Sequence, residues 1–570
     1  MKYKVGYIIF VFLLSVGATA NAQVDFNFNG LGRAIVTTNK LGGTTLANDS
    51  LSSDKGLSGY ALFDLQPNLV INKAVRANAI LPLRNPFGSF FGSGTTFAFR
   101  QFQIAGRIGK KIDYEFGDIY IGSDMTKYTV YNPNEIYNTF ESDIHKNRRN
   151  VLEYENFVQG NQWRLQGAKA STAFDFNKII ERVGVNVFGT RTNATNERGI
   201  PDRLLVGGRV GIKQSEYLSL GLNYVNLADV KIKTEEYEHS NSVITGDVKL
   251  TLDREKILAQ IDGEFGMSNF KNVQIFDDST VQYKDNVTDV GLKVIYKPLK
   301  LKLFSSYRVV GAQFSSPSAQ TARLNVDQSV WLFNKLDNNN VNRNLTLYDR
   351  LTDEHLYNRS ISAVLYNYLP QYGNLSPFGD ATPNRAGITV GLGTDTSTKI
   401  INAEARIDMF NELIGEGVVE KRKFTSLRGG VVFNFSELIK LKRRMSVNVG
   451  VRQENTTRAG LASIDFKSML MDYGVTIETF KGVDFLFGAK SLTAKGNEYL
   501  SMRDNFNLLV DFPVYELDLK ETIYSIGARV RFSERSYFML NYNTSTYNET
   551  KNYNFNYNFN QLFCNYTLIF

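Results

Sequence analysis

The feature that most constrains this sequence is a two-residue alternation of apolar and polar side chains, which recurs from end to end. Near the C-terminus, Ile526, Val530 and Phe532 fall on one face, while Arg529 and Arg531 fall on the other. On a helix, at about 100° per residue, such apolar groups would scatter around the whole cylinder, whereas on a strand they separate onto two faces. The sequence therefore predicts an all-β chain whose strands each have an apolar and a polar face.

Alternation alone does not separate a membrane barrel from a soluble sandwich, but the lengths of the connections do. Outer-membrane barrels have short turns at one end and longer loops at the other. Short turns such as Gly109–Lys111, Gln214–Tyr217 and Lys481–Gly482 alternate along the chain with longer segments. This predicts an antiparallel up-and-down transmembrane β-barrel of about 22 strands, within a range of roughly 18 to 24.

Some segments are expected to lie outside the regular strands. Long extracellular loops are expected near residues 123–161, 314–385 and 491–520. The segments Val151–Val158 and Phe506–Leu517 are either further strands or ordered parts of loops.

The N-terminus has the pattern of a secretory signal. Lys2 and Lys4 precede an apolar run, Val5–Val16, and the small-x-small sequence Ala20-Asn21-Ala22 follows. The apolar run is shorter than the roughly 20 residues that a transmembrane helix needs. We therefore expect residues 1–22 to be a signal peptide and residues 23–570 to form the barrel.

The last ten residues, Gln561–Phe570, alternate as well, with Tyr566, Leu568 and Phe570 on one face. This segment resembles the closing strand of bacterial outer-membrane β-barrels, which their assembly machinery reads. The wider resemblance is to porin-like barrels of the Bacteroidota type, and it is carried also by Ala20-Asn21-Ala22-Gln23 and by Asn-, Lys-, Tyr- and Phe-rich strands. It names no single family. It implies the outer membrane of a Gram-negative bacterium, with lipid, lipopolysaccharide and the barrel assembly machinery as partners.

A barrel of this width would leak unless its lumen is obstructed. Alternation begins almost at the expected mature N-terminus, so an N-terminal plug domain is not expected. Either the barrel is smaller than counted, or loops fold inward to constrict it. The segment 314–385 is too long for an ordinary connection and contains Trp331, Tyr348, Tyr357 and Tyr366. Three roles stay open for it: a pore constriction, an extracellular cap or docking surface, and a mobile loop with no specific task.

The loop near 123–161 carries a cluster of charged residues. They are Asp143, His145, Lys146, Arg148 and Arg149. A solvated loop that meets anionic surface sugars or lipopolysaccharide is the simpler interpretation, and a ligand site is the alternative.

Charged side chains also fall on the polar faces of the strands, where they would line a lumen. They are Arg107, Asp113, Glu115, Arg209, Arg529 and Arg531. The formal net charge of +8 would favour anions by raising their local concentration. The acidic members offset part of that field, and opposed charges inside a barrel also tie its wall together.

Several function classes are not expected. The three histidines, His145, His239 and His355, have no metal-binding spacing, and no G-x-S-x-G elbow occurs. We therefore expect no enzyme, no cofactor and no metal site. The single cysteine, Cys564, excludes a disulfide scaffold, and the basic residues are too dispersed for a nucleic-acid site.

Two functions agree with these patterns. The first is a porin-like passive channel for small solutes, with anions favoured by the charge. The second is a structural or accessory barrel subunit of an outer-membrane secretion or protein-assembly complex.

Overall fold

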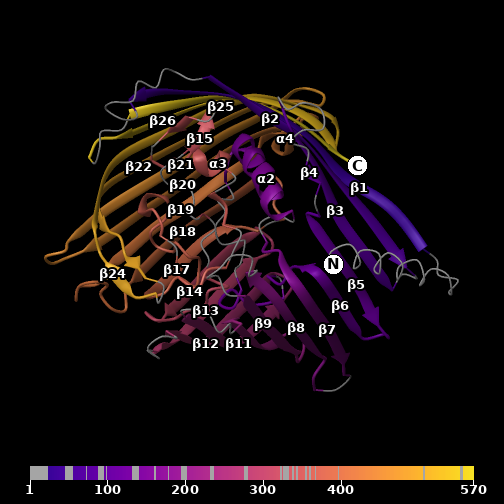
Figure 1. Cartoon of the computed structure of the whole chain (residues 1–570), viewed down its shortest axis with the longest axis vertical. Helices are drawn as coiled ribbons and strands as arrows, with labels where there is room; N and C mark the ends of the chain where they lie inside the picture. The colour runs from indigo at the N-terminus through magenta and orange to yellow at the C-terminus, as the bar shows by residue number, and fades with distance from the viewer. Residues whose placement is uncertain are drawn as a thin grey trace.

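The computed structural model is a closed barrel of 22 antiparallel strands in up-and-down order (Figure 1). Its first strand, β1 (Val24–Thr44), pairs with β2 (Lys55–Ile71) on one side and with the last strand, β27 (Asn556–Ile569), on the other. The sheet therefore closes on itself and leaves no unpaired edge. Both the predicted fold class and the predicted strand number are confirmed.

The structure describes residues 24–44, 55–71, 74–87, 96–97, 99–122, 124–130, 140–158, 162–176, 179–193, 202–230, 237–274, 280–320, 324, 333–336, 339–341, 344–353, 356–358, 361–365, 367–395, 397–504, 507–551 and 556–570. The expected signal peptide, residues 1–22, lies outside these ranges.

The other strands of the wall follow in chain order, each beside the one before it. They are β3 (Val75–Pro86), β5 (Gln101–Ile108), β6 (Ile112–Ile119), β7 (Leu165–Asp175), β8 (Arg182–Asn193), β9 (Arg203–Lys213), β10 (Leu218–Asp229), β11 (Tyr237–Asp253), β12 (Ile257–Gln274), β13 (Thr280–Tyr296), β14 (Leu301–Val310), β17 (Arg385–Thr394), β18 (Ile401–Asn411), β19 (Lys423–Asn434), β20 (Met445–Arg458), β21 (Ile464–Phe480), β22 (Val483–Tyr499), β25 (Val514–Ser533) and β26 (Ser536–Glu549).

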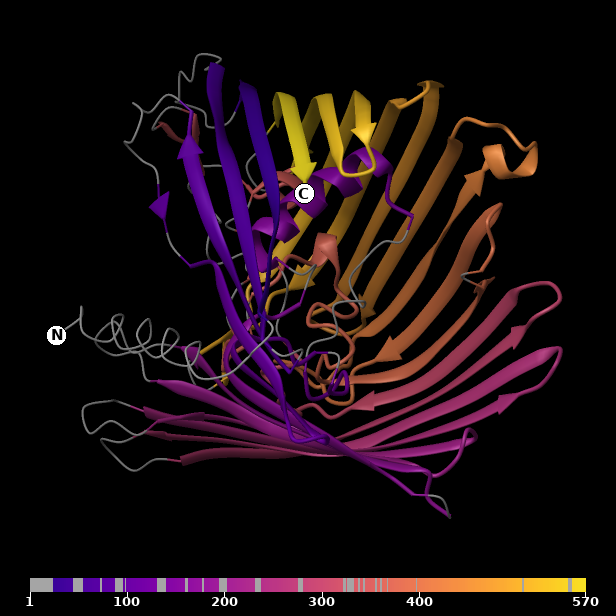
Figure 2. The ribbon, with the colours of Figure 1, turned by 90° about the vertical axis from the view of Figure 1, so that its right-hand side faces the viewer.

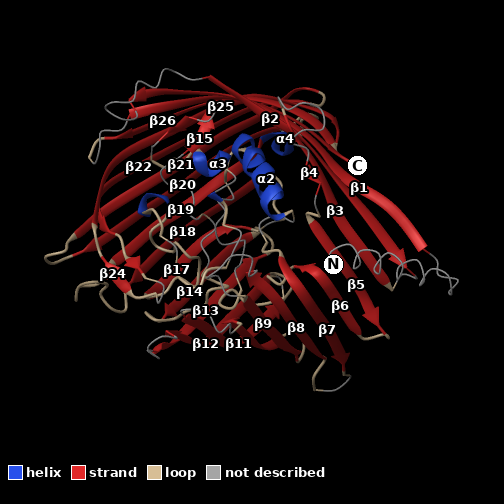
Figure 3. Cartoon of the chain, viewed as in Figure 1, coloured by secondary structure: helices blue, strands red, loops and turns tan. Residues whose placement is uncertain are grey.

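A few short elements lie outside this regular wall (Figure 3). The two-residue strand β4 (Thr96–Phe97) extends the pairing of β3, and two small hairpins form in loops, β15 (Phe333–Leu336) with β16 (Asn339–Val341) and β23 (Met502–Arg503) with β24 (Leu509–Asp511). The helices are α2 (Asp143–Phe157), α3 (Asp349–Thr352), α4 (Phe435–Leu438) and the 3-10 turn η4 (Pro370–Tyr372). Among the described residues, no helix has the length and apolar character to cross a membrane.

The strands expose an apolar outer face and bury the opposite one. On β10, Leu222 and Tyr224 are 53% and 45% exposed, whereas Asn223 and Val225 between and beside them are buried. A closed barrel pairs all backbone polar groups within the sheet, and its apolar exterior suits hydrocarbon. This is the architecture of bacterial outer-membrane proteins, and the outer membrane is where the chain resides.

The terminal strand follows the same rule. Tyr566 and Leu568 are exposed on the outer face, while Phe563 is buried on the inner one. The backbone of Phe570 bonds to Gly30 in both directions, with N–O distances of 2.9 and 3.1 Å. The last residue therefore completes the contact with β1.

Two predicted segments differ from the structure. The segment 491–520 is mostly strand, because β22 and β25 continue to Tyr499 and begin at Val514. Their lengths of 17 and 20 residues exceed the roughly 10 residues that cross the membrane, so the sheet extends beyond the hydrocarbon. Of the two alternatives for Val151–Val158, the strand is wrong and the ordered part of a loop is confirmed, because the segment is the end of α2 with its C-cap. The buried Ile144, Val151 and Leu152 of α2 recur at helical spacing.

Closure between β1 and the chain end predicts a position-specific effect of adding a methyl group. A Cβ at Gly30 would lie 2.6 Å from the carbonyl oxygen of Asp64, whereas a Cβ at Gly32 would have only ordinary contacts, the nearest at 3.7 Å. We expect Gly30→Ala to destabilise the barrel by about 1–3 kcal/mol, since overpacking forces the backbone to shift. Heat-modifiable migration and urea unfolding measure the effect. Gly32→Ala is the control, and equal stability of the two variants would contradict the prediction.

Candidate functional site: two loops inside the barrel

The lumen holds two long connections that fold inward. One is the α2 loop, residues 120–164 between β6 and β7, and the other is the long loop, residues 311–384 between β14 and β17. Figure 2 shows α2 within the ring of strands, beside the inner wall. The described parts of both loops pack on inner-face residues of the wall.

A buried ion cluster holds the start of α2. The ammonium group of Lys490, on β22, lies 2.9 Å from a carboxylate oxygen of Glu141 and also contacts Asp472 on β21. Arg149 binds the other oxygen of Glu141 at 2.9 Å and Glu153 at 2.6 Å. Lys490, Glu141 and Asp472 have side chains no more than 7% exposed. The cluster compensates charges that burial alone would strongly disfavour.

The next residues of α2 bind the wall through polar groups. The two ring nitrogens of His145 form hydrogen bonds with serine hydroxyl groups. One lies 2.9 Å from the hydroxyl of Ser525 on β25, and the other lies 2.8 Å from the hydroxyl of Ser142. Thr476 of β21 donates to the carboxylate of Asp143 at 3.0 Å. Burial, followed by the positive charge of Lys490, lowers the pKa of His145 to about 3. His145 is therefore neutral at physiological pH.

The far end of α2 reaches the first strands. Glu155 accepts a hydrogen bond from Arg33 of β1 at 3.4 Å and another from Tyr60 of β2. Two turns earlier, the guanidinium of Arg148 lies 3.9 Å from the ring centre of Phe563 on β27. The helix thus contacts strands from both ends of the chain.

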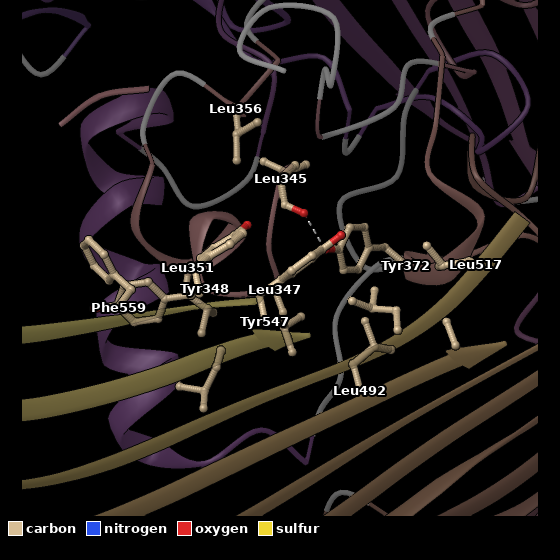
Figure 4. Packing of buried hydrophobic residues seen from close by; sticks show 14 of the residues in the cluster. Leu345, Leu347, Tyr348, Leu351, Leu356, Tyr372, Leu492, Leu517, Tyr547 and Phe559 are labelled. Carbon is tan, nitrogen blue, oxygen red and sulfur yellow. Dashed lines mark hydrogen bonds between the residues drawn. The ribbon is translucent and has the colours of Figure 1, made fainter. Parts of the chain in front are cut away.

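The long loop packs on the inner wall through a hydrophobic cluster, shown in Figure 4. Its members from the loop are Leu345, Leu347, Tyr348, Leu351, Leu356 and Tyr372, and they contact wall residues that include Leu492, Leu517, Tyr547 and Phe559. Polar groups at its edge are also paired, since the hydroxyl of Tyr372 lies 2.7 Å from Glu521 of β25 and that of Tyr348 lies 2.7 Å from Gln561 of β27. The segment is therefore fixed to the wall by both apolar and polar contacts.

The two loops also bind each other. Ser316 and Ser318 of the long loop donate to the carbonyl oxygens of Tyr128 and Thr129 in the α2 loop, at 2.8 and 2.5 Å. On the other side, the rings of Phe157 and Tyr357 lie 6.1 Å apart, centre to centre. The described parts of the two loops therefore form one internal body, which we call the loop plug.

A second ion cluster ties the loop plug to β13 and β14. Lys127 lies 2.6 Å from Asp289 and 3.2 Å from Asp380, and Arg308 contacts both carboxylates. The hydroxyl of Tyr128 donates to Asp289 at 2.5 Å. The plug is thus held at opposite parts of the wall.

The sequence prediction located some of these residues and missed others. Tyr348 and Tyr357 lie inside the barrel and are 4% and 5% exposed, whereas Trp331 and Tyr366 are outside the described residues. The simpler interpretation of the charged cluster around His145, a solvated loop that meets surface sugars, is wrong, because the cluster belongs to a helix packed on the inner wall. Helical spacing of the apolar residues Ile144, Val151 and Leu152 was the available signal for α2.

The charges predicted to line the lumen lie on the inner face, and each has an opposite partner. The ion pairs are Arg107 with Asp113 at 2.6 Å, Glu115 with Lys169 at 3.2 Å, Arg209 with Asp247 at 2.7 Å, Arg529 with Asp484 at 2.7 Å and Arg531 with Asp484 at 2.9 Å. Four of these pairs link neighbouring strands, and the Arg209–Asp247 pair reaches across β10 from β9 to β11. Together they offset the positive field of the arginines. In the described part of the chain, no group of three or more His, Cys, Asp or Glu residues has the arrangement of a metal site.

A third structured region lies where three loops meet beyond the long strands. Arg422 is 2% exposed and binds Glu412, Glu416 and Glu498 at 2.9 to 3.1 Å. Arg503 also binds Glu416, which brings the connections 412–422 and 500–513 together. We call this region the loop platform. It includes the neighbouring connection 459–463, since Arg458 at the end of β20 stacks over Phe512 at 5.2 Å and donates to the carbonyl oxygen of Ala462 at 2.7 Å. Its core is charged and buried.

Removing the cation at the centre of the first cluster should release α2. Lys490→Met leaves Glu141 and Asp472 buried without it, which we expect to cost about 3–5 kcal/mol. Trp163, which is 4% exposed with its ring 6.4 Å from that of Phe157, reports the change by fluorescence in a Trp331→Phe background. Lys467→Met removes an exposed pair and should cost less than about 1 kcal/mol. Equal denaturation midpoints for the two variants would contradict the role of Lys490 in holding α2.

Low pH should weaken the docking of α2 on the inner wall, because protonation of His145 favours the released helix. Above about pH 6.5 a histidine is neutral in both the docked and the released helix, so it imposes no penalty. As the pH falls from about 6.5 to 5, only the released form takes up a proton, and docking loses about 1.4 kcal/mol per pH unit. Trp163 fluorescence in denaturant at both pH values tests this. The variant His145→Gln should lack this part of the pH dependence, and an unchanged dependence would refute it.

Comparison with known proteins adds likeness of architecture only. No family model and no curated protein sequence matches the chain. Among solved structures, the unliganded ferric citrate transporter FecA is 9% identical, with 95% of this chain and 79% of that chain covered and a TM-score of 0.49. The FrpB iron transporter from Neisseria meningitidis is 9% identical, with 95% of this chain and 82% of that chain covered and a TM-score of 0.42. OccK11 from Pseudomonas aeruginosa is 8% identical, with 96% of each chain covered and a TM-score of 0.36. Each identity is too low to indicate function, and each TM-score is below 0.5.

Proposed function

We propose that the protein is an outer-membrane channel for small solutes, anions among them, whose size limit is set by the loop plug. The observation that carries the proposal is the pair of inward loops, which bind each other and opposite parts of the inner wall. A barrel of about 22 strands would otherwise enclose a wide aqueous lumen. The loop plug is therefore the element that decides what passes.

The inner wall near the short turns supports an aqueous path up to the plug. The ion-paired residues Arg107, Asp113, Asp175 and Arg182 are 56%, 51%, 76% and 58% exposed there. Charged side chains in contact with water favour entry of polar solutes. Because these arginines are paired with carboxylates, we expect only a modest preference for anions over cations.

A second candidate function is an accessory subunit of an envelope complex. The observation that favours it is the loop platform, whose tips carry exposed apolar side chains above a buried, ion-paired core. Val419 is 89% exposed and Leu461 is fully exposed. Apolar residues grouped on an ordered surface are typical of protein contacts.

Planar bilayer recordings with the purified barrel test the first proposal. The backbone N–H of Asn384 already donates to the carbonyl oxygen of Gly311 at 3.1 Å, so a short Gly-Ser linker can replace residues 312–383 without moving β14 or β17. We expect steady ohmic openings for the native chain and a several-fold larger conductance for this variant, since the lumen of so many strands is wide.

A milder variant guards against failure of the deletion to fold. Lys490→Met keeps both inward loops but loosens the α2 loop, and it should give larger, fluctuating openings. Lys467→Met, which changes an exposed side chain, should conduct as the native chain does. Equal conductance of the native chain and both loop variants would refute the loop plug as the element that sets the size limit, and absence of any openings would refute the channel itself. A silent barrel that co-purifies with a stoichiometric partner would favour the accessory subunit.

A further inference from the structure

The connection between β19 and β20 joins exposed apolar side chains to a run of cations. Leu438, Ile439 and Leu441 are 50%, 60% and 45% exposed. The basic residues among and after them are Lys440, Lys442, Arg443 and Arg444, all exposed. We propose that this connection, with the adjoining turn after β21, binds anionic phospholipid at the periplasmic surface of the outer membrane.

The connection has a defined shape. The short helix α4 ends where Lys440 adopts a φ of 53°, and the N–H of Leu441 donates back to the carbonyl oxygen of Ser436 at 2.9 Å. Glycine is the usual residue at such a left-handed position. Glycine would adopt this backbone conformation with less strain than lysine does. The presence of lysine at this position is therefore consistent with a role for its ammonium group.

The location of the connection places it at the membrane boundary. It lies at the end of the barrel with the short turns, which faces the periplasm in outer-membrane proteins. Phe433 continues the outer face of β19, and its ring centre lies 4.4 Å from that of Phe435 in α4. On β21, which pairs with β20, Phe480 is 68% exposed beside Lys481. Aromatic side chains at this level mark the membrane–water interface.

The cations of this connection are available to a ligand. Within the described part of the chain, the side chains of Lys440, Lys442 and Arg444 form no ion pair, although the backbone N–H of Arg444 donates to the carboxylate of Glu478 at 3.1 Å. In other turns, Lys213 and Lys297 pair with Glu181 and Asp253. The side chain of Arg443 donates to the carbonyl oxygen of Thr479, which fixes the connection to β21. Three cationic side chains therefore stand without an ion pair next to apolar side chains, and Glu437 is the acidic residue within the same connection.

An anionic phospholipid matches both halves of this surface. Its acyl chains cover the exposed leucine and isoleucine side chains, while lysine and arginine reach the phosphate from the interface. Each basic residue near an anionic membrane surface strengthens binding about fivefold. A soluble acidic protein would use the cations but would leave the apolar side chains without a partner.

Native mass spectrometry of the full barrel, titrated with phosphatidylglycerol and with phosphatidylcholine of the same chains, tests the proposal. We expect the triple variant Lys440→Gln, Lys442→Gln, Arg444→Gln to lose about tenfold or more in affinity for phosphatidylglycerol, with affinity for phosphatidylcholine unchanged. Leu438→Ser with Leu441→Ser should weaken the binding of both lipids, because it removes the apolar half of the surface.

The matched control removes the same charge at the opposite end of the barrel, through Lys421→Gln, Lys423→Gln and Lys520→Gln, which are all exposed. Heat-modifiable migration verifies that each variant folds. If the control loses as much phosphatidylglycerol binding as the test variant, net charge alone accounts for it and the site is overturned. Unchanged binding in the test variant overturns it as well. Conductance is independent of these outcomes, so the lipid site and the channel can fail separately.

Discussion

The whole structure depends on pairing every backbone polar group of a strand inside hydrocarbon, where water is absent to satisfy them. A sheet meets this condition only if its first and last strands join, which β1 and β27 do along their shared length. The number of strands then fixes the width of the lumen, and that width creates the need for the loop plug. The inward loops are thus a consequence of closing so many strands into one ring.

The loop plug solves the problem of width with both apolar and ionic contacts. Its hydrophobic clusters bury leucine, valine and tyrosine side chains against inner-face residues that would otherwise meet water. The buried ions around Lys490 and Lys127 contribute less to net stability, because the cost of desolvation offsets much of their attraction. Their geometry nevertheless specifies one position for each loop, since any displacement leaves a buried charge without its partner.

Sequence reasoning recovered what depends on local periodicity. The alternation around Arg529 and Arg531 separated the lipid face from the lumen face, and the order of short and long connections gave the strand number. It failed where distant residues decide the structure. Nothing near His145 or Glu141 indicates that Ser525 and Lys490, more than 300 residues later, will bury them. Ion pairs of this kind turn a charged segment that looks solvated into a buried helix.

The position of α2 has a consequence for assembly. The helix bridges the seam of the barrel, since Arg148 stacks on the last strand and Glu155 binds the first. These contacts can all form only after the two ends of the chain have met, so the helix docks late and then holds the first and last strands together. Separation of the first and last strands would require these helix contacts to break, so they oppose lateral opening of the assembled barrel.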